Sequence, residues 1–475
     1  MKKLFMTLHR KLLIGSLCSM GLAGCVYYGD IHSHSHEIDT KTLVTPHRYT
    51  PQQISPVARA GWWTLFHDPE LNALIAVAMQ DSPDLQSAKA RVEAATHLAE
   101  RAESALWPTV DLSGYLQRQR FPEEGLIPPP FNGKIFNIGE LGLNFNYEFD
   151  FWGKNRQALR AKINEEYAAK AELAESELVL SAAIAEVYFR LEYDLSVIRL
   201  AKEKVAVNEA LLRIVSNRMH HGIESDIPVK RTLATLAQTK ETLEQYRQGE
   251  ALSRHQLAVL LGENPFTTDI RTKQFAFHHY PVSIPSSLPA HLLANRPDIL
   301  AAKWQVEAAA NQVNVAKAWF FPDINLSALY SYQSIELNQL FTAQNRNNAL
   351  TGAIDLPIFD AGARRAGLRE KYAEYDLAVF QYNRTLLAAL RDVADQLSSL
   401  RAINAELNAE NLSYHALSHT YDLYRTRYRH GIADYAEVLE NRDSLLQQSM
   451  AQLALQRAQV QTVVLLLKAL GGRDV

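Results

Sequence analysis

The stretch KNRQALRAKINEEYAAKAELAESELVLSAAIAEVYFRLEYDLSVIRLAKEKVAVNEALLRIVSNRMHH, residues 154–221, contains neither glycine nor proline. Alanine, leucine, glutamate, arginine and glutamine dominate it, and all five favour helices. Residues 368–430 form a second stretch that also lacks glycine and proline. At about 1.5 Å per residue, such a helix spans on the order of 100 Å, far more than a typical globular helix. The sequence therefore predicts two very long helices.

Each long helix is predicted to end at a glycine, Gly222 or Gly431, because glycine tolerates the left-handed conformation that closes a helix. Another helical stretch follows each glycine, to about Leu261 and Leu470. Each pair of helices is therefore expected to form a hairpin with its tip at the glycine.

Two segments with strand periodicity precede each long helix. Apolar and polar side chains alternate along them, as at Leu141, Leu143 and Phe145, which predicts a sheet with two unlike faces. The predicted strands are 110–117, 139–149, 324–334 and 349–359. A helix of about 35 residues is expected before each strand pair, from near Pro69 to Leu106 and from near Leu288 to Phe320.

The chain contains an internal repeat. Residues 82–113 match residues 296–327 at twelve positions without a gap, and segments around the two tip glycines match in the same order. The predicted organisation is a signal peptide (1–24), a linker (25–60), a first repeat (61–265), an inter-repeat linker (266–287) and a second repeat (288–471).

The first residues have the composition of a secretory signal. A basic segment, Lys2 to Lys11, precedes a short apolar run that ends at Leu22-Ala23-Gly24-Cys25. This ending resembles a lipobox, which implies that Cys25 becomes the first mature residue and carries lipid; an ordinary signal with a chance cysteine is the alternative. Val26 after the cysteine favours the outer membrane by the enterobacterial sorting rule.

Composition excludes several classes of protein. A net charge of -3 gives no basic surface for nucleic acid, and no later run of about 18 apolar residues predicts a membrane helix. The only other cysteine, Cys18, lies in the signal, so no disulfide is expected. His32, His34 and His36 alternate in the linker, where a solvated segment is favoured over a metal site, and no metal or other cofactor is expected.

The strands connect the fold to a function. Strands of roughly ten residues are long enough to cross a bilayer, but a barrel in lipid must be closed. Four strands are too few, since membrane barrels begin near eight, so several chains must share one barrel. The predicted fold is mainly α, with helical hairpins and four strands per chain in a shared β-barrel. The alternative is a small soluble sheet beside a plain coiled coil.

The sequence resembles the TolC-like outer-membrane factors, in particular their lipid-anchored NodT-type branch, over residues 61–471. The residues that carry the resemblance are Trp62-Trp63, Asp68-Pro69, Ser82-Pro83-Asp84-Leu85, Asp150-Phe151-Trp152-Gly153-Lys154, Arg296-Pro297-Asp298-Ile299, Leu356-Pro357-Ile358-Phe359-Asp360-Ala361-Gly362 and Arg427-Tyr428-Arg429-His430-Gly431.

That resemblance implies a homotrimer with a twelve-stranded barrel and a periplasmic helical tunnel. Its periplasmic end would bind a membrane-fusion adaptor and an inner-membrane transporter. The chain would then be the outer-membrane channel of a tripartite efflux pump for small toxic compounds. Alternatives are the exit duct of type I protein secretion and a structural coiled-coil lipoprotein without a pore.

The resemblance also implies two sets of site residues. The hairpin tips would bind the adaptor, or else act only as turns; they comprise His220, His221, Gly222, Ile223, Arg429, His430, Gly431 and Ile432. Glu437 and Glu440 would form acidic rings at the periplasmic aperture, or else lie on a solvated helix face, and Tyr428 would help to hold the closed state.

Two positions depart from the family pattern. Ala433 stands where a basic residue is common, and Pro228 where an acidic residue is common, with Asp226 nearby. The salt bridges of the closed state therefore cannot be assigned from sequence. No zinc-protease, nucleophile-elbow or phosphate-loop motif occurs, so no catalytic residue and no enzymatic activity is predicted. The sequence names neither the substrate nor the energy source of the transporter.

Overall fold

A computed structural model describes residues 31–38, 61–124, 127–266 and 296–472 of the 475-residue chain. The predicted signal peptide, the lipid-bearing Cys25 and nearly all of the predicted inter-repeat linker lie outside the described residues. Within the described ranges, no helix combines the length and the apolar character needed to cross a membrane.

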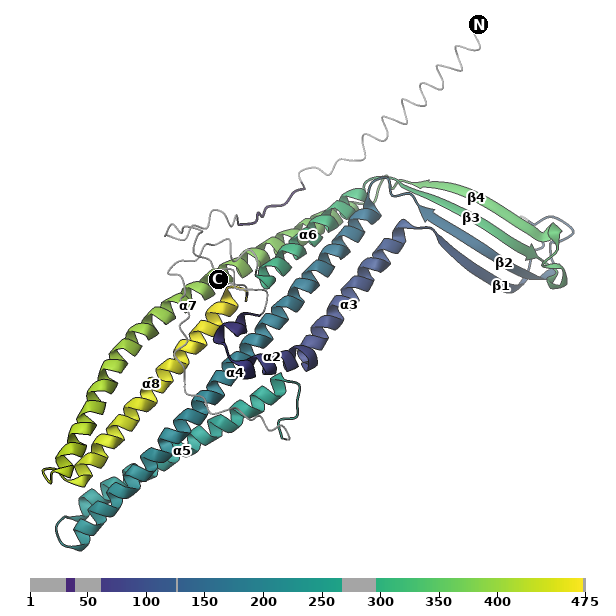
Figure 1. Cartoon of the computed structure of the whole chain (residues 1–475). Helices are drawn as coiled ribbons and strands as arrows, with labels where there is room; N and C mark the ends of the chain where they lie inside the picture. The colour runs from purple at the N-terminus through teal and green to yellow at the C-terminus, as the bar shows by residue number, and fades with distance from the viewer. Residues whose placement is uncertain (1–30, 39–60, 125–126, 267–295, 473–475) are drawn as a thin grey trace. The chain divides into compact units, whose positions relative to one another are not determined.

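The described elements repeat in the order helix, two strands, long helix, shorter helix (Figure 1). The first set comprises α2 (Pro69–Asp81), α3 (Pro83–Glu103), β1 (Thr109–Arg120), β2 (Ile135–Glu148), α4 (Lys154–His220) and α5 (Asp226–Leu260). The second set comprises α6 (Pro297–Ala318), β3 (Asp323–Ser334), β4 (Arg346–Asp355), α7 (Ala363–Arg429) and α8 (Tyr435–Ala469). The prediction of a mainly helical chain with four strands is confirmed.

The chain folds as two compact units, and each contains segments of both sets. The described residues of unit 1 are 31–37, 91–124, 127–170 and 301–383, and they include the sheet. The described residues of unit 2 are 38, 61–90, 171–266, 296–300 and 384–472, and they include both hairpin tips. The helices α4 and α7 contribute one segment to each unit.

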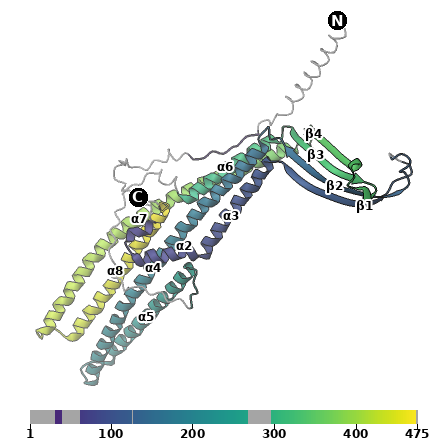
Figure 2. The same ribbon diagram turned by 45° about the vertical axis from the view of Figure 1, so that its right-hand side comes forward.

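The sheet of unit 1 is antiparallel, in the order β1-β2-β3-β4 (Figures 1 and 2). The register places Leu112 opposite Leu143, and Ala328 opposite Leu350, on one face. Large apolar side chains on this face are exposed, among them Val110, Leu112, Leu116, Ile135, Leu143, Leu350 and Ile354. The opposite face is polar, and there Gln333 donates hydrogen bonds to Tyr115 and Glu140. The predicted inequality of the two faces is confirmed.

An aspartate organises the turn from strand to helix in each repeat. Asp150 accepts hydrogen bonds from the backbone N–H groups of Asn155 and Arg156, and Asp360 accepts them from Gly362 and Arg364. Gly153 (φ +79°) and Gly362 (φ +90°) take the left-handed conformation that these turns require. The duplicated motifs noted in the sequence are therefore helix-starting turns.

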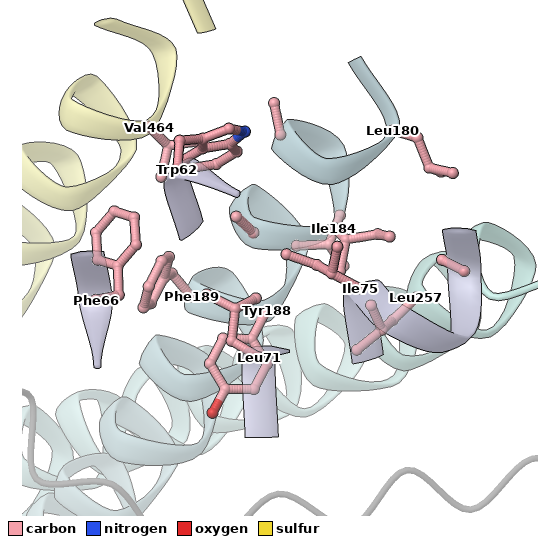
Figure 3. Close-up of a cluster of buried hydrophobic side chains, with 14 of the residues drawn as sticks. Trp62, Phe66, Leu71, Ile75, Leu180, Ile184, Tyr188, Phe189, Leu257 and Val464 are labelled. Atoms are coloured by element: carbon pink, nitrogen blue, oxygen red, sulfur yellow. The ribbon is translucent and has the colours of Figure 1, made fainter. Parts of the chain in front are cut away.

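The main core lies in unit 2, where the short Trp62–Phe66 3₁₀-helix and α2 pack on α4 (Figure 3). The Trp62 indole donates to Ser181 Oγ at 3.1 Å, and the rings of Phe66 and Phe189 lie 4.9 Å apart. Val464 of α8 joins the same cluster, so the core connects both repeats.

The single helix expected from Pro69 to Leu106 is wrong, because the chain breaks it at Ser82 into α2 and α3. Pro83 lacks an N–H donor, and a residue before proline is disfavoured in the α conformation. Ser82 accordingly adopts φ -60° and ψ 123°. The helical periodicity of the sequence continues through Ser82, which explains the error.

Two boundaries in the second repeat also differ from the prediction. The strand β4 ends at Asp355 instead of Phe359, because Pro357 cannot continue a sheet ladder. The helix α7 begins at Ala363, before Gly367 rather than after it. A Cβ added at Gly367 would lie 3.0 Å from the Trp319 ring, so the glycine accommodates a close approach of that ring.

Asp68 connects the start of α2 to the core. Its carboxylate accepts hydrogen bonds from the N–H groups of Glu70 and Leu71 at 2.9 and 3.2 Å, and from the Tyr188 hydroxyl at 2.8 Å. Because Asp68 and Tyr188 are both buried, loss of the carboxylate removes a helix cap and leaves a buried hydroxyl without this acceptor.

We predict that Asp68→Ala lowers the free energy of unfolding by about 2–3 kcal/mol, whereas Asp68→Asn, which still caps and accepts, costs about 1 kcal/mol or less. Denaturant titration of the detergent-purified protein measures both. Tyr188→Phe should make Asp68→Ala less costly in the double variant, since the hydroxyl that loses its acceptor is then absent. Additive losses would show that the two side chains act independently.

Candidate functional site at the hairpin tips

The two hairpin tips have the same backbone turn. The Ile223 N–H donates to the Arg218 carbonyl and the Ile432 N–H to the Arg427 carbonyl, each at 2.9 Å. Gly222 (φ +72°) and Gly431 (φ +70°) precede these isoleucines. This is the Schellman arrangement, which satisfies the last carbonyls of a helix. The predicted glycine tips are present in both hairpins.

The tips expose apolar side chains. Ile223 is 72% exposed, Ile432 is 66% exposed and Ile227, in the first turn of α5, is 74% exposed. His220, His221, Arg429 and His430, which neighbour the isoleucines in the sequence, are also exposed. Exposed large apolar side chains beside polar ones are typical of protein-binding sites.

The predicted aperture residues lie in the first turns of α8. Glu437 accepts a hydrogen bond from the Asp434 N–H at 3.3 Å, while Asp434 accepts one from Ala436, so the two form a capping box. Glu440 is exposed, and its side chain is not needed for the cap. The ring of Tyr428 lies 5.0 Å from that of Tyr435, across the tip.

An ion pair that the sequence did not predict joins the two hairpins near their tips. The guanidinium of Arg218, in the last turn of α4, pairs with the carboxylate of Asp434, the residue that caps α8. The pair connects the first repeat to the second. Asp226 instead pairs with Lys230 within α5, at 3.7 Å, and does not link the hairpins.

Further polar contacts join α4 to α8 farther from the tips. Arg442 donates to Glu203, and its guanidinium lies 5.3 Å from the ring centre of Tyr421. Asp443 accepts hydrogen bonds from Lys204 and Asn208 at 2.8 and 2.7 Å. Leu439 and Leu446 pack with Val207 beside these groups. Together with Arg218–Asp434, the pairs Glu203–Arg442 and Lys204–Asp443 form what we name the hairpin ladder.

The sequence contained a signal for one part of the ladder. Asp434 and Glu437 have the spacing of a capping box, which would have placed the start of α8 and assigned Glu437 a local partner. The pairing of Arg218 with Asp434 had no such signal, because the partners belong to different hairpins and are 216 positions apart.

Among the described residues, no group of three or more histidine, cysteine, aspartate or glutamate side chains has an arrangement suited to a metal ion. The rings of His32 and His34 lie 5.1 Å apart.

The chain is similar to known outer-membrane proteins along most of its length. It is 28% identical over 423 residues to the multidrug resistance outer membrane protein MdtP of Escherichia coli strain K12, and this covers 87% of the chain and 86% of that protein.

Two solved structures show the same fold. The outer membrane protein VceC of Vibrio cholerae has a TM-score of 0.77 and 32% sequence identity, covering 89% of this chain and all of that one. The outer-membrane channel OprN has a TM-score of 0.79 and 25% identity, covering 90% and 99% of the two chains.

The model of the outer membrane efflux protein family matches residues 74–263 and 288–472, which are the greater part of both repeats. The resemblance to TolC-like outer-membrane factors is thereby confirmed. The protein belongs to the outer membrane efflux protein family, and it is an outer-membrane channel component.

Proposed function

We propose that the chain forms the outer-membrane exit duct of a tripartite pump that exports small toxic compounds. The observation that carries this proposal is the duplicated unit of strands and long hairpins, which matches the efflux family over both repeats. The name of MdtP, a multidrug resistance protein, supports small molecules as cargo over secreted protein.

The sheet supports assembly as a trimer. The strands β1 and β4 are the two ends of the sheet order, so each leaves one row of backbone hydrogen-bonding groups unpaired within the described chain. Three copies joined edge to edge would give twelve strands and a closed barrel. The exposed apolar face would then contact lipid, and the polar face would line the lumen. The same proposal includes a lipid on Cys25 and a division of the chain into two repeats, residues 61–265 and 288–471.

The hairpin tips support binding of a periplasmic adaptor, which would connect the duct to an inner-membrane transporter. Ile223 and Ile432 provide the apolar anchors, and His220, His221, Arg429 and His430 provide a polar rim. Loss of a central apolar anchor typically weakens a protein interface most strongly.

We predict that Ile223→Asp and Ile432→Asp abolish drug export while the protein still reaches the outer membrane, because a charge at the anchor opposes burial. Drug susceptibility and adaptor co-purification measure this. The conservative change Ile223→Leu should keep both. Export that survives both aspartate variants would rule out the tips as the adaptor surface.

Glu437 and Glu440 support an acidic aperture. They are both exposed on the first turns of α8, three positions apart, and so share a helix face. Three-fold symmetry would concentrate six carboxylates there, which favours cations and opposes closure by repulsion. The capping box gives Glu437 a second, local role, so Glu440 is the more selective probe of the aperture.

We predict a small cation-preferring conductance for the detergent-purified protein in a planar bilayer. Glu440→Gln should lower the preference for cations, and Glu437→Gln should do so without unfolding α8, because glutamine also completes a capping box. Glu103→Gln, at an exposed position on α3, serves as the control. Unchanged ion selectivity in both aperture variants would contradict the acidic ring.

The hairpin ladder supports a closed resting state. Its three ion pairs hold α8 against α4, so separation of the hairpins would break all three. Each pair is partly exposed and therefore worth at most about 1 kcal/mol, which makes opening accessible to a bound partner.

We predict that Arg218→Gln and Arg442→Gln together increase the single-channel conductance or the fraction of time that the channel is open. Lys230→Gln, which removes an ion pair within one helix, should leave both unchanged. A double variant with the conductance of the wild type would show that the ladder does not restrain the aperture.

A further inference from the structure

Unit 1 contains a cationic pocket between the segment 31–38 and α7. Its volume is about 320 Å³. The lining side chains are Ile31, His32, His34, Arg365, Arg369, Tyr372, Ala373 and Asp376. Arg365 and Arg369 are four positions apart on α7 and so share one face of the helix. None of these residues belongs to the sheet or to the hairpin tips.

The two arginines have no acidic partner within the described ranges. Their neighbours on α7 do: Arg364 pairs with Asp360, and Lys371 pairs with Glu374. No carboxylate of the described residues lies within ion-pair distance of the Arg365 or Arg369 guanidinium. Both side chains are exposed, so their donor groups are free to bind an anion in the pocket.

The one acidic side chain of the pocket is already engaged. Asp376 accepts hydrogen bonds from Ser33 Oγ at 2.6 Å and Ser35 Oγ at 2.7 Å, and from the His34 N–H at 3.4 Å. Burial raises the pKa of Asp376, but the hydrogen bonds from Ser33 and Ser35 outweigh burial and hold that pKa below its usual value. Asp376 therefore fixes the backbone of the segment and stays ionised, but it forms no ion pair with Arg365 or Arg369, so the two arginines leave the pocket with a net positive charge.

The same contacts hold the second wall of the pocket in place. Ile31 packs on an apolar cluster formed by Val313, Ala316, Phe320 and Leu368 of unit 1. Asn383 donates a hydrogen bond to the His36 carbonyl at 3.1 Å. On α6, Lys317 places its ammonium 5.7 Å from the ring centre of Tyr372, which adds positive charge beside the pocket. The pocket is thus built from fixed elements on both sides.

From this geometry we propose that the pocket binds the phosphate group of an anionic phospholipid. Guanidinium groups bind phosphate oxygens through paired, charge-assisted hydrogen bonds, which lysine does not reproduce. Arg365 is the third residue of α7, directly after the turn that leads from β4. The pocket therefore lies at the start of the helices that follow the sheet, where a membrane-embedded sheet would bring it to the headgroups of the periplasmic leaflet.

The two parts of this proposal have different foundations. Phosphate recognition depends only on the pocket and its free arginines. The choice of a lipid as the source of the phosphate rests on the proposed placement of the sheet in the membrane. Binding measured in detergent does not require an open channel, so failure of this proposal is distinguishable from failure of the proposed function.

The test is native mass spectrometry of the delipidated full-length protein, titrated with phosphatidylglycerol and, separately, with zwitterionic phosphatidylcholine. We expect tighter binding of phosphatidylglycerol, and a loss of affinity on the order of tenfold in the Arg365→Gln/Arg369→Gln double variant. The matched control is Arg384→Gln/Arg391→Gln, two exposed arginines of α7 outside the pocket. The control should bind phosphatidylglycerol like the wild type.

Three outcomes would overturn the proposal. Equal affinity for the two lipids would show that negative charge is not recognised. An equal loss in the control variant would show that general positive charge, and not the pocket, attracts the lipid. Full competition by millimolar inorganic phosphate, without preference for the lipid, would assign the pocket to free phosphate. Oligomeric mass in the same spectra shows whether the double variant remains assembled.

Discussion

Within the described residues, β1 and β4 each have one unpaired edge, and these edges are the constraint on which the rest of the structure depends. A four-stranded sheet with one apolar face and two open edges cannot satisfy its backbone groups in lipid. The register of the strands gathers apolar side chains on one face, since paired positions such as Leu112 and Leu143 lie on the same side of the sheet. Pairing with further copies is the solution that keeps the apolar face outward and the polar face inward.

Duplication explains how one chain supplies both a sheet and paired hairpins. Each repeat provides two strands, a 67-residue helix and a 35-residue helix. The turn chemistry is duplicated too, with Asp150 and Asp360 at the helix starts and a Schellman turn at each tip. The repeats differ near the hairpin tips, where we propose that the channel opens and closes. Asp434 caps α8 and pairs with Arg218, whereas the side chain of Ser225, at the corresponding position before α5, forms no cap.

Much of this fold was predictable because the long helices, the strands and the tips depend mainly on the residues within each segment. Uninterrupted helix formers, alternating strands and tip glycines predicted the long helices, the four strands and both tips. The break at Ser82 was missed because a helical periodicity continues across it, although Pro83 carried the information. The start of α7 was missed because the helix continues through Gly367. That glycine accommodates the ring of Trp319, and the sequence gives no sign of this contact.

The site was predictable only in part. The tip residues and the acidic residues of α8 could be named from sequence, and their roles remain predictions. The hairpin ladder and the pocket beside Arg365 could not, because each brings together side chains that are far apart in the chain. Pairing between such side chains depends on how helices pack, and no spacing rule within one helix encodes it.

The most direct test of the claim that three chains share one barrel is disulfide trapping between β1 of one copy and β4 of the next. Ser113→Cys would be combined in turn with cysteine at Asn347, Ala349, Thr351 or Ala353, all on the polar face. The native cysteines, Cys18 and Cys25, lie outside the strands, so they do not complicate the pairing. Covalent trimers on a denaturing gel, for one register and for neither single variant, are the predicted result. Monomers alone in every register would contradict the shared barrel.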